Sequence, residues 1–336
     1  MHQTSILNLK KRLTLPELTS GILAGNRVTL SKGITLVESV LPEDEEMAAA
    51  LLEALLPYTG QALRIGITGV PGVGKSTFIE TFGNYLTSNN KKLAVLTIDP
   101  SSQLTHGSIL GDKTRMESLS KNPNAYIRPS ASGSTLGGIA HKTREAALLC
   151  EAAGFDTIII ETVGIGQSET AVKNMVDFFL LLMLAGAGDE LQGIKKGIME
   201  MADALVITKA DGENKKKAAM AVADYTHALH LFQPPPSGWT ARVMTCSAQE
   251  NEGIASVWDT ILQFEAHTKL NGFFLQNRKE QNKTWLYDCF SQLLQQEVKK
   301  SQTLGTQIND LEKKVEAGSI SAYQAAKQML KNFKES

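Results

Sequence analysis

Cysteine is scarce in this chain of 336 residues, and the three that occur are Cys150, Cys246 and Cys289. They lie far apart and form no C-x-x-C pair, so the sequence supports neither a disulfide framework nor a zinc ribbon. Structural disulfides belong to oxidising compartments. The cysteine pattern therefore favours a reducing compartment, and we expect a cytoplasmic protein.

Long apolar runs and an excess of one charge are also missing. The longest apolar run, residues 178–187, has about ten residues, which is too short to cross a bilayer. The net charge is −1 and no basic stripe stands out, so we expect neither a membrane nor a nucleic acid among the partners. The first sixteen residues are basic but have no apolar core, which leaves a short organellar presequence as an open alternative.

A glycine-rich stretch, residues 63–77, is the most informative part of the chain. It reads as a strand, a loop and a helix, and the loop has the pattern G-x-x-x-x-G-K-[ST]. Glycines let successive N–H groups turn toward an anion, and the helix adds its positive end. The alternative is a Gly-rich turn without a ligand. We predict a nucleoside triphosphate site made of Gly69, Val70, Pro71, Gly72, Val73, Gly74, Lys75, Ser76 and Thr77.

Short apolar segments continue to alternate with helical segments after this loop. The alternation predicts an α/β fold of the P-loop NTPase kind, with a mostly parallel sheet flanked by helices. Such sheets bind ligands at the carboxyl ends of their strands, and nearly every polar cluster of the chain follows an expected strand. These further strands are residues 93–98, 157–160, 178–184, 204–207 and 241–245.

The regions around this core divide the chain into three expected parts. Residues 1–57 form an N-terminal helical extension, in which Pro42 and the acids after it mark a helix start. No clear periodicity precedes that helix. Residues 58–265 form the nucleotide-binding domain, and residues 266–336 form a C-terminal helical arm.

The C-terminal arm is expected to contain helices at residues 273–297 and 319–333. Such an arm either caps the domain or joins two chains, and we favour a dimer interface. The first helix carries an apolar stripe made of Trp285, Leu286, Cys289, Phe290, Leu293 and Leu294.

Residues 208–211, Thr-Lys-Ala-Asp, resemble the N-K-x-D element of guanine-nucleotide proteins. An aspartate there accepts from the guanine N1–H and amino groups together, and adenine offers no such pair. Threonine stands where this element usually has asparagine. The change alters one supporting hydrogen bond, so it bears on the affinity for the nucleotide and not on the identity of the base. An exposed turn is the alternative. The predicted base-binding residues are Thr208, Lys209 and Asp211, with Ser247 and Ala248 after the next strand.

Three acids are candidate Mg²⁺ ligands beside Ser76. Asp99 and Glu161 each end an expected buried strand, and Asp112 lies in a loop expected to close over the triphosphate. Mg²⁺ prefers oxygen ligands, few of them from protein. The alternative reading of each acid is a helix cap or a solvated side chain.

Long contiguous motifs make the chain similar to the MeaB/ArgK family, a family of SIMIBI-class P-loop GTPases. The motifs are residues 99–102, 107–116, 161–169 and 186–197, and the resemblance extends from about residue 25 to 330. Members of this family escort the adenosylcobalamin-dependent methylmalonyl-CoA mutase. The resemblance therefore implies GTP, GDP and Mg²⁺ as ligands and such an acyl-CoA mutase as partner. It further implies a homodimer.

The resemblance also implies a mechanism. Intrinsic GTP hydrolysis is slow, the mutase accelerates it, and the cycle gates cofactor loading and rescues inactivated mutase. Residues 107–116, 161–169 and 186–197 would be three switches, with Ser76, Asp99, Asp112 and Glu161 around Mg²⁺. Gln167 is a candidate for orienting water. The catalytic residues would be Lys75, Asp112, Glu161, Gln192 and Lys195, the last two in the switch that signals to the mutase.

Two other functions remain as alternatives. The first is a kinase or ATPase associated with lysine, arginine and ornithine transport, against which Asp211 argues because it reads guanine. The second is a nickel-delivery GTPase, whose relatives carry Cys and His stretches. Here the close pair, His227 and His230, is interpreted as part of a solvent-exposed helix face.

Overall fold

The structure, a computed structural model, describes residues 12–98, 116–129, 136–162, 168–186, 196–300 and 302–335. The chain divides into two compact units, residues 1–279 and residues 280–336. The first unit contains the sheet and all of the described candidate site residues. The domain boundaries expected at residues 57 and 265 remain predictions.

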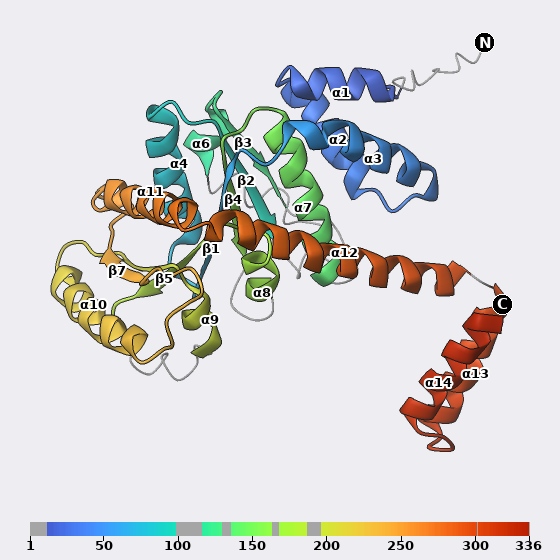
Figure 1. Cartoon of the computed structure of the whole chain (residues 1–336). Helices are drawn as coiled ribbons and strands as arrows, with labels where there is room; N and C mark the ends of the chain where they lie inside the picture. Colours follow the sequence, from blue (N-terminus) through green and yellow to red (C-terminus); the bar gives the residue numbers. More distant parts are fainter. Residues whose placement is uncertain are drawn as a thin grey trace, which may run out of the picture. The chain divides into compact units, whose positions relative to one another are not determined.

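A seven-stranded parallel sheet forms the centre of the first unit (Figure 1). Its order is β3-β2-β4-β1-β5-β6-β7, and β1 is bonded to β4 on one edge and to β5 on the other. The sheet confirms the predicted fold class. Its strands are β1 (Leu63–Gly69), β2 (Leu93–Ile98), β3 (Ala125–Arg128), β4 (Thr157–Thr162), β5 (Phe178–Leu184), β6 (Ala204–Thr208) and β7 (Arg242–Thr245).

Strand β3 is the one strand of this sheet that the sequence did not predict. It has four residues and lies at the edge of the sheet, beside β2. Ala125, Tyr126 and Ile127 are buried, but a run this short gives little periodic signal. Contacts from distant residues hold it in place: the Arg27 guanidinium donates to the Ala125 carbonyl, and the Tyr126 hydroxyl lies 3.0 Å from that of Ser31.

Helices cover both faces of the sheet, and each face has its own hydrophobic cluster. One cluster includes α4 (Lys75–Ser88), α6 (Glu117–Lys121), α9 (Lys196–Met201), α10 (Asn214–His230) and α11 (Ile254–Leu270). The other includes α7 (Leu136–Ala152) and α8 (Ser168–Lys173). Because both faces are covered, the strands are almost continuously apolar.

Three N-terminal helices pack on the outer side of α7 (Figure 1). They are α1 (Leu15–Leu23), α2 (Arg27–Glu38) and α3 (Pro42–Leu55), followed by the short 3₁₀ helix η1 (Leu56–Tyr58). As predicted, α3 begins at Pro42 with acids in its first turn.

Helix α2 was not predicted, although Leu30, Gly33, Ile34 and Val37 are buried at helical spacing. The glycine hides the pattern, because it adds no apolar side chain to the stripe. A Cβ on Gly33 would lie 2.7 Å from Ile22 Cδ1 and 3.1 Å from Leu149 Cδ2, so glycine lets α2 pack against both side chains without displacing them.

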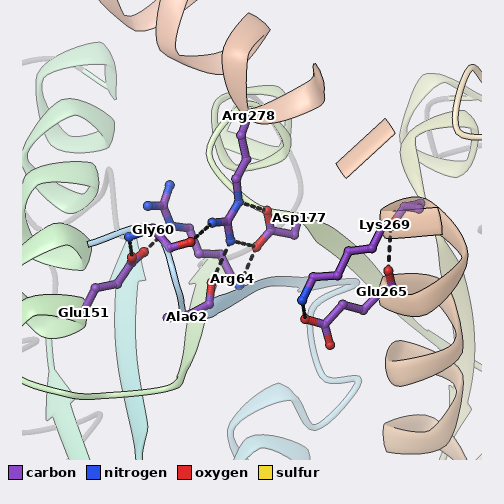
Figure 2. Close-up of polar contacts among 9 residues, drawn as sticks. Gly60, Ala62, Arg64, Glu151, Asp177, Glu265, Lys269 and Arg278 are labelled. Carbon is purple, nitrogen blue, oxygen red and sulfur yellow. Dashed lines mark hydrogen bonds and ion pairs between the residues drawn. The ribbon is translucent and has the colours of Figure 1, made fainter. Parts of the chain in front are cut away.

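Two buried ion pairs lie at the amino edge of the sheet, opposite the carboxyl ends of its strands (Figure 2). Arg64 in β1 donates from Nε to Glu151 of α7 at 2.6 Å. Arg278 bonds both carboxylate oxygens of Asp177, at 2.7 and 2.6 Å, and also donates to the Gly60 and Ala62 carbonyls. The Arg64 backbone N–H donates to Asp177 as well, at 2.8 Å. The network therefore joins the starts of β1 and β5 to the helix that carries Arg278.

That helix, α12 (Phe273–Lys300), passes from the first unit into the second. The second unit continues with α13 (Gln302–Glu316) and α14 (Ala322–Glu335). Helices α12 and α14 match the two helices predicted for the arm, and α13 was not predicted. Among the described residues, no helix is both long enough and apolar enough to cross a bilayer.

The buried pair at the amino edge predicts a large and specific stability effect. Asp177→Asn keeps the shape of the side chain but leaves the Arg278 cation, whose side chain is 13% exposed, without its counter-charge. We expect a loss of about 3 kcal/mol in the free energy of unfolding, measured by urea titration with circular dichroism.

The matched control is Glu117→Gln, the same carboxylate-to-amide change in the pair with Lys121 on α6, whose side chains are 74% and 72% exposed. A surface pair of this kind contributes little to stability, so the loss should be much smaller than that of Asp177→Asn. Equal losses in the two variants would show that the Asp177–Arg278 pair does not stabilise the first unit.

Candidate functional site

The predicted phosphate loop joins β1 to α4 at the carboxyl edge of the sheet. Gly72 and Gly74 have φ angles of +76° and +88°, which residues with a side chain rarely adopt. A Cβ on Gly69 would lie 2.6 Å from the Leu182 carbonyl oxygen of β5. The loop shape therefore depends on glycine at these positions. The nine predicted residues, 69–77, form the end of β1, this turn and the first turn of α4.

Lys75 is the first residue of α4, and its Nζ donates to the Gly69 carbonyl at 2.8 Å. The ammonium group thus lies across the loop, close to the residue where the loop begins. Burial lowers the pKa of Lys75, and the charges of Glu161 and Glu169 act in the opposite direction. A partly buried cation beside the N-terminus of a helix is an arrangement that suits a phosphate group.

Glu169 is a site residue that the sequence did not single out. It lies in the first turn of α8, is 2% exposed, and is close enough to Lys75 to affect its pKa. The residue belongs to the motif at 161–169, but a motif does not indicate which of its acids faces the loop. Only the packing of α8 against β1 and β4 brings this carboxylate near the lysine.

The predicted base-binding residues lie at the ends of β6 and β7, on the same edge of the sheet as the phosphate loop. The Ser247 hydroxyl donates to Asp211 Oδ2 at 2.6 Å, which fixes the orientation of that carboxylate. The Thr81 hydroxyl of α4 donates to the Ala248 carbonyl at 3.0 Å. The structure therefore brings the two predicted segments together beside the helix that follows the phosphate loop.

Lys209 lies between the base-binding turn and the phosphate loop. It has a φ angle of +54°, and its Cε would be 3.9 Å from a Cβ built on Gly74. The Asn214 side-chain amide donates to the Lys209 carbonyl at 2.6 Å, and the Ala210 N–H donates to the Cys246 carbonyl at 3.0 Å. These contacts hold a strained turn in a defined conformation.

Two of the four predicted Mg²⁺ ligands are in the described part of the chain. Ser76 lies in the first turn of α4, and Glu161 lies near the end of β4, paired with Ile67 of β1 and 5% exposed. Both offer the oxygen donors that Mg²⁺ prefers, so the described donors fit this ion. Next to Glu161, the Thr162 hydroxyl donates to the Thr68 hydroxyl at 2.7 Å and links β4 to β1.

Several predicted residues lie outside the described residues. They include the metal candidates Asp99 and Asp112 and the catalytic candidates Gln167, Gln192 and Lys195. The elements that flank them are described: β2 ends at Ile98, β4 at Thr162 and β5 at Leu184. Those three ends lie at the carboxyl edge of the sheet, as the phosphate loop does.

The histidine pair and the cysteines give no sign of a transition-metal site. His227 and His230 are exposed on α10. No group of three or more His, Cys, Asp or Glu side chains that could hold a metal ion occurs in the described ranges. Burial raises the pKa of the Cys246 thiol to about 12, so this cysteine stays protonated at neutral pH.

Comparison with known proteins adds four findings. The sequence model of the family described as "Methylmalonyl Co-A mutase-associated GTPase MeaB" matches residues 30–303. The chain is 49% identical over 273 residues to GTPase ArgK of Escherichia coli (strain K12), across 81% of this chain and 82% of that protein. It is 43% identical over 341 residues to the "Methylmalonic aciduria type A homolog, mitochondrial" of Mus musculus, across 98% and 82%. A solved structure described as "Crystal structure of LAO/AO transport system kinase" matches with a TM-score of 0.76 and 37% identity, across 97% of this chain and 99% of the other.

The phosphate loop predicts the effect of removing its lysine. Lys75→Ala deletes the cation that lies across the loop, so the affinity for a nucleoside triphosphate should fall by at least about 100-fold in calorimetry. The control is Lys92→Ala, the same change at an exposed lysine before β2, at the amino edge of the sheet. Unchanged affinity in Lys75→Ala would rule out this loop as the phosphate site.

Proposed function

The chain belongs to the MeaB family of methylmalonyl-CoA mutase-associated GTPases, and from this membership we propose that it is a chaperone and regulator of an adenosylcobalamin-dependent acyl-CoA mutase. The client is methylmalonyl-CoA mutase. GTP hydrolysis gates cofactor loading and supports protection or reactivation of the mutase. The family description supports the client, and the name of the mouse relative refers to methylmalonic acid, the acyl part of the same substrate.

The observation that carries the nucleotide part of this proposal is the pairing of Ser247 with Asp211. The 2.6 Å bond orients a carboxylate at the edge of the sheet where the phosphate loop also lies. A carboxylate that faces the guanine N1–H and amino groups accepts from both, whereas adenine presents an acceptor at N1. This arrangement supports GTP and GDP as the ligands rather than ATP.

Mg²⁺ is proposed as the second cofactor, held by Ser76, Asp99, Asp112 and Glu161. The oxygen donors of Ser76 and the buried position of Glu161 support the two ligands of this set that are described. When bound, the ion neutralises charge on the phosphates. Lys75, whose ammonium group lies across the loop, would bind the outer phosphates.

The proposed catalytic residues are Lys75, Asp112, Glu161, Gln192 and Lys195. Phosphoryl transfer needs an oriented water and groups that stabilise charge on the transferred phosphoryl, and no covalent intermediate with the protein is required. A site that is complete only when the partner binds is slow by itself. One missing stabilising contact is worth about 10³ to 10⁵ in rate. This is the reason for proposing low intrinsic activity that the mutase stimulates.

A homodimer formed by the C-terminal arm is also proposed. In the second unit, Leu286, Tyr287, Phe290 and Leu293 of α12 are 54–68% exposed, which makes one apolar stripe. The same unit has a groove of about 480 Å³ lined mainly by apolar side chains of α12, α13 and α14. Contiguous apolar surface on this scale commonly marks a protein–protein interface, and the family resemblance favours a second copy of the chain.

A cytoplasmic location is part of the proposal. The scarcity of cysteine supports it, because Cys150, Cys246 and Cys289 are all free thiols.

The deciding experiment for the function is hydrolysis of GTP and of ATP by the pure protein, each with and without methylmalonyl-CoA mutase. We expect slow GTP turnover that rises about tenfold or more with the mutase, and ATP turnover at least about 100-fold slower than GTP turnover. The Lys75→Ala variant, measured in parallel, reports any contaminating nucleotidase.

Each contrary result contradicts a different part of the proposal. GTP turnover that no mutase changes would keep the GTPase and reject the client. A preference for ATP would reject guanine reading by Asp211 and favour a transport-associated kinase, the activity for which the related solved structure is named.

The dimer makes a separate prediction. Phe290→Glu places a charge in the exposed apolar stripe of α12, so the dimer dissociation constant should rise by about 100-fold in sedimentation equilibrium. The control is Gln292→Glu, which adds the same charge two residues after Phe290, on the side of α12 that faces away from it. A parent protein that sediments with the mass of one chain would contradict the proposed dimer.

A further inference from the structure

The side chain of Thr81 in α4 holds the loop that follows β7. Its hydroxyl donates to the Ala248 carbonyl at 3.0 Å. Among the described residues, this is the one hydrogen bond between α4 and residues 246–253, which we call the base loop. Thr81 follows Lys75 on the same helix and lies about 9 Å farther along its axis, at about 1.5 Å per residue. One helix therefore connects the phosphate loop with the base loop.

Ala248 lies between two peptide groups whose orientations are fixed. The Ser247 carbonyl accepts from the Glu252 N–H at 3.0 Å, and in the next peptide group the Ala248 carbonyl accepts from Thr81. Both peptide groups are planar and trans, so the two bonds together set the backbone conformation of Ala248. The Ala248 N–H points in the opposite direction to the Ser247 carbonyl, away from Glu252.

The Ala248 N–H is available to a ligand, because within the described part of the chain it donates to no other residue. The preceding residue, Ser247, donates to Asp211, the carboxylate predicted to read guanine. Guanine carries an acceptor, O6, next to its N1–H, whereas adenine carries an amino donor at the same place. A backbone donor beside Asp211 therefore suits a purine with an oxygen at position 6 and disfavours adenine.

The other described bonds of the base loop lead to different elements. Ser247 connects it to Asp211 after β6, and Lys215 of α10 pairs with Glu252 at 2.9 Å, with both side chains about half exposed. Neither bond acts on the Ala248 carbonyl. Loss of the Thr81 hydroxyl would release that carbonyl and leave the orientation of Asp211 intact, so the two parts of base reading can be separated.

We propose that Thr81 is a positioning residue for base selection, which holds Ala248 so that its N–H binds the O6 atom of guanine. The proposal deepens the proposed function and rests on it in taking the base loop as part of a guanine-nucleotide site. It requires that loss of the hydroxyl weakens nucleotides with an oxygen at position 6 and leaves those without this oxygen unaffected.

The test uses the full chain with Thr81→Val and Thr81→Ser, and measures dissociation constants by calorimetry. The ligands are GDP, inosine diphosphate, which has O6 but no 2-amino group, and 2-aminopurine riboside diphosphate, which has the amino group but no O6. Valine removes the donor, so both O6-containing nucleotides should bind about tenfold more weakly. The 2-aminopurine nucleotide should stay within about twofold of the parent, and Thr81→Ser, which keeps the hydroxyl, within about threefold for all three.

Two reference variants calibrate the result. Thr226→Val is the same change at another half-buried helical threonine, whose hydroxyl donates to the Val222 carbonyl of its own helix at 2.6 Å. It should leave all three affinities unchanged. Lys75→Ala removes the phosphate-binding cation, and because all three nucleotides carry the same phosphates, it should weaken them by one common factor.

Three results would overturn the proposal. Parent-like GDP affinity in Thr81→Val would show that the hydroxyl does not position the base loop. An equal loss for all three nucleotides would place its effect on the phosphates or on the fold, and not on O6. A Thr81→Ser variant that binds GDP as weakly as Thr81→Val would show that the hydroxyl is not the group that matters.

A failure of the proposed function gives a different pattern. If the parent prefers ADP to GDP, guanine reading fails, the role of Thr81 fails with it, and the parent alone shows this. If the parent prefers GDP and Thr81→Val keeps the parent's ratio of GDP to 2-aminopurine nucleotide affinity, only the positioning role fails. The client mutase does not enter the measurement, so a wrong client leaves the result unaffected.

Discussion

Strand β1 is bonded on both edges and buried on both faces, and the candidate site depends on this position. All seven residues of the strand are buried. Close packing is possible because two of them are glycines: a Cβ on Gly66 would lie 2.8 Å from Phe179 and Val172, and one on Gly69 would meet Leu182. At its start, Arg64 is buried and needs Glu151 as a partner, since an unpaired buried charge is strongly destabilising. A strand held so firmly at its base can present an exposed glycine loop at its other end in a defined shape.

The sequence predicted the fold class and most of the strands because the relevant signals are local. Short apolar runs, the glycine spacing of residues 69–77 and the Thr-Lys-Ala-Asp turn at 208–211 are each readable within a few residues. In a parallel sheet all strands run the same way, so their carboxyl ends, and the residues that follow them, lie at one edge. That rule alone predicts that the residues following β1, β4, β6 and β7 lie at the same edge of the sheet.

Contacts between distant parts of the chain were not predictable in this way. Strand β3 has too few residues for a periodic signal, and the burial pattern of α2 includes a glycine. The nearness of Glu169 to Lys75 and the bond between Thr68 and Thr162 exist only because particular strands and helices are neighbours. The Arg278–Asp177 pair joins α12 to the start of β5, and nothing in either local sequence indicates the other residue.

Thr208 departs from the motif, which usually has asparagine at this position, and the structure shows what its side chain contacts instead. The sequence suggested that replacing asparagine alters a bond that supports the nucleotide. The hydroxyl of Thr208 reaches the Val73 carbonyl at 2.7 Å, so the position still provides a buried donor to the phosphate loop. Because the base-binding turn begins at the same residue, one position at the end of β6 both contacts the phosphate loop and starts the turn predicted to bind the base.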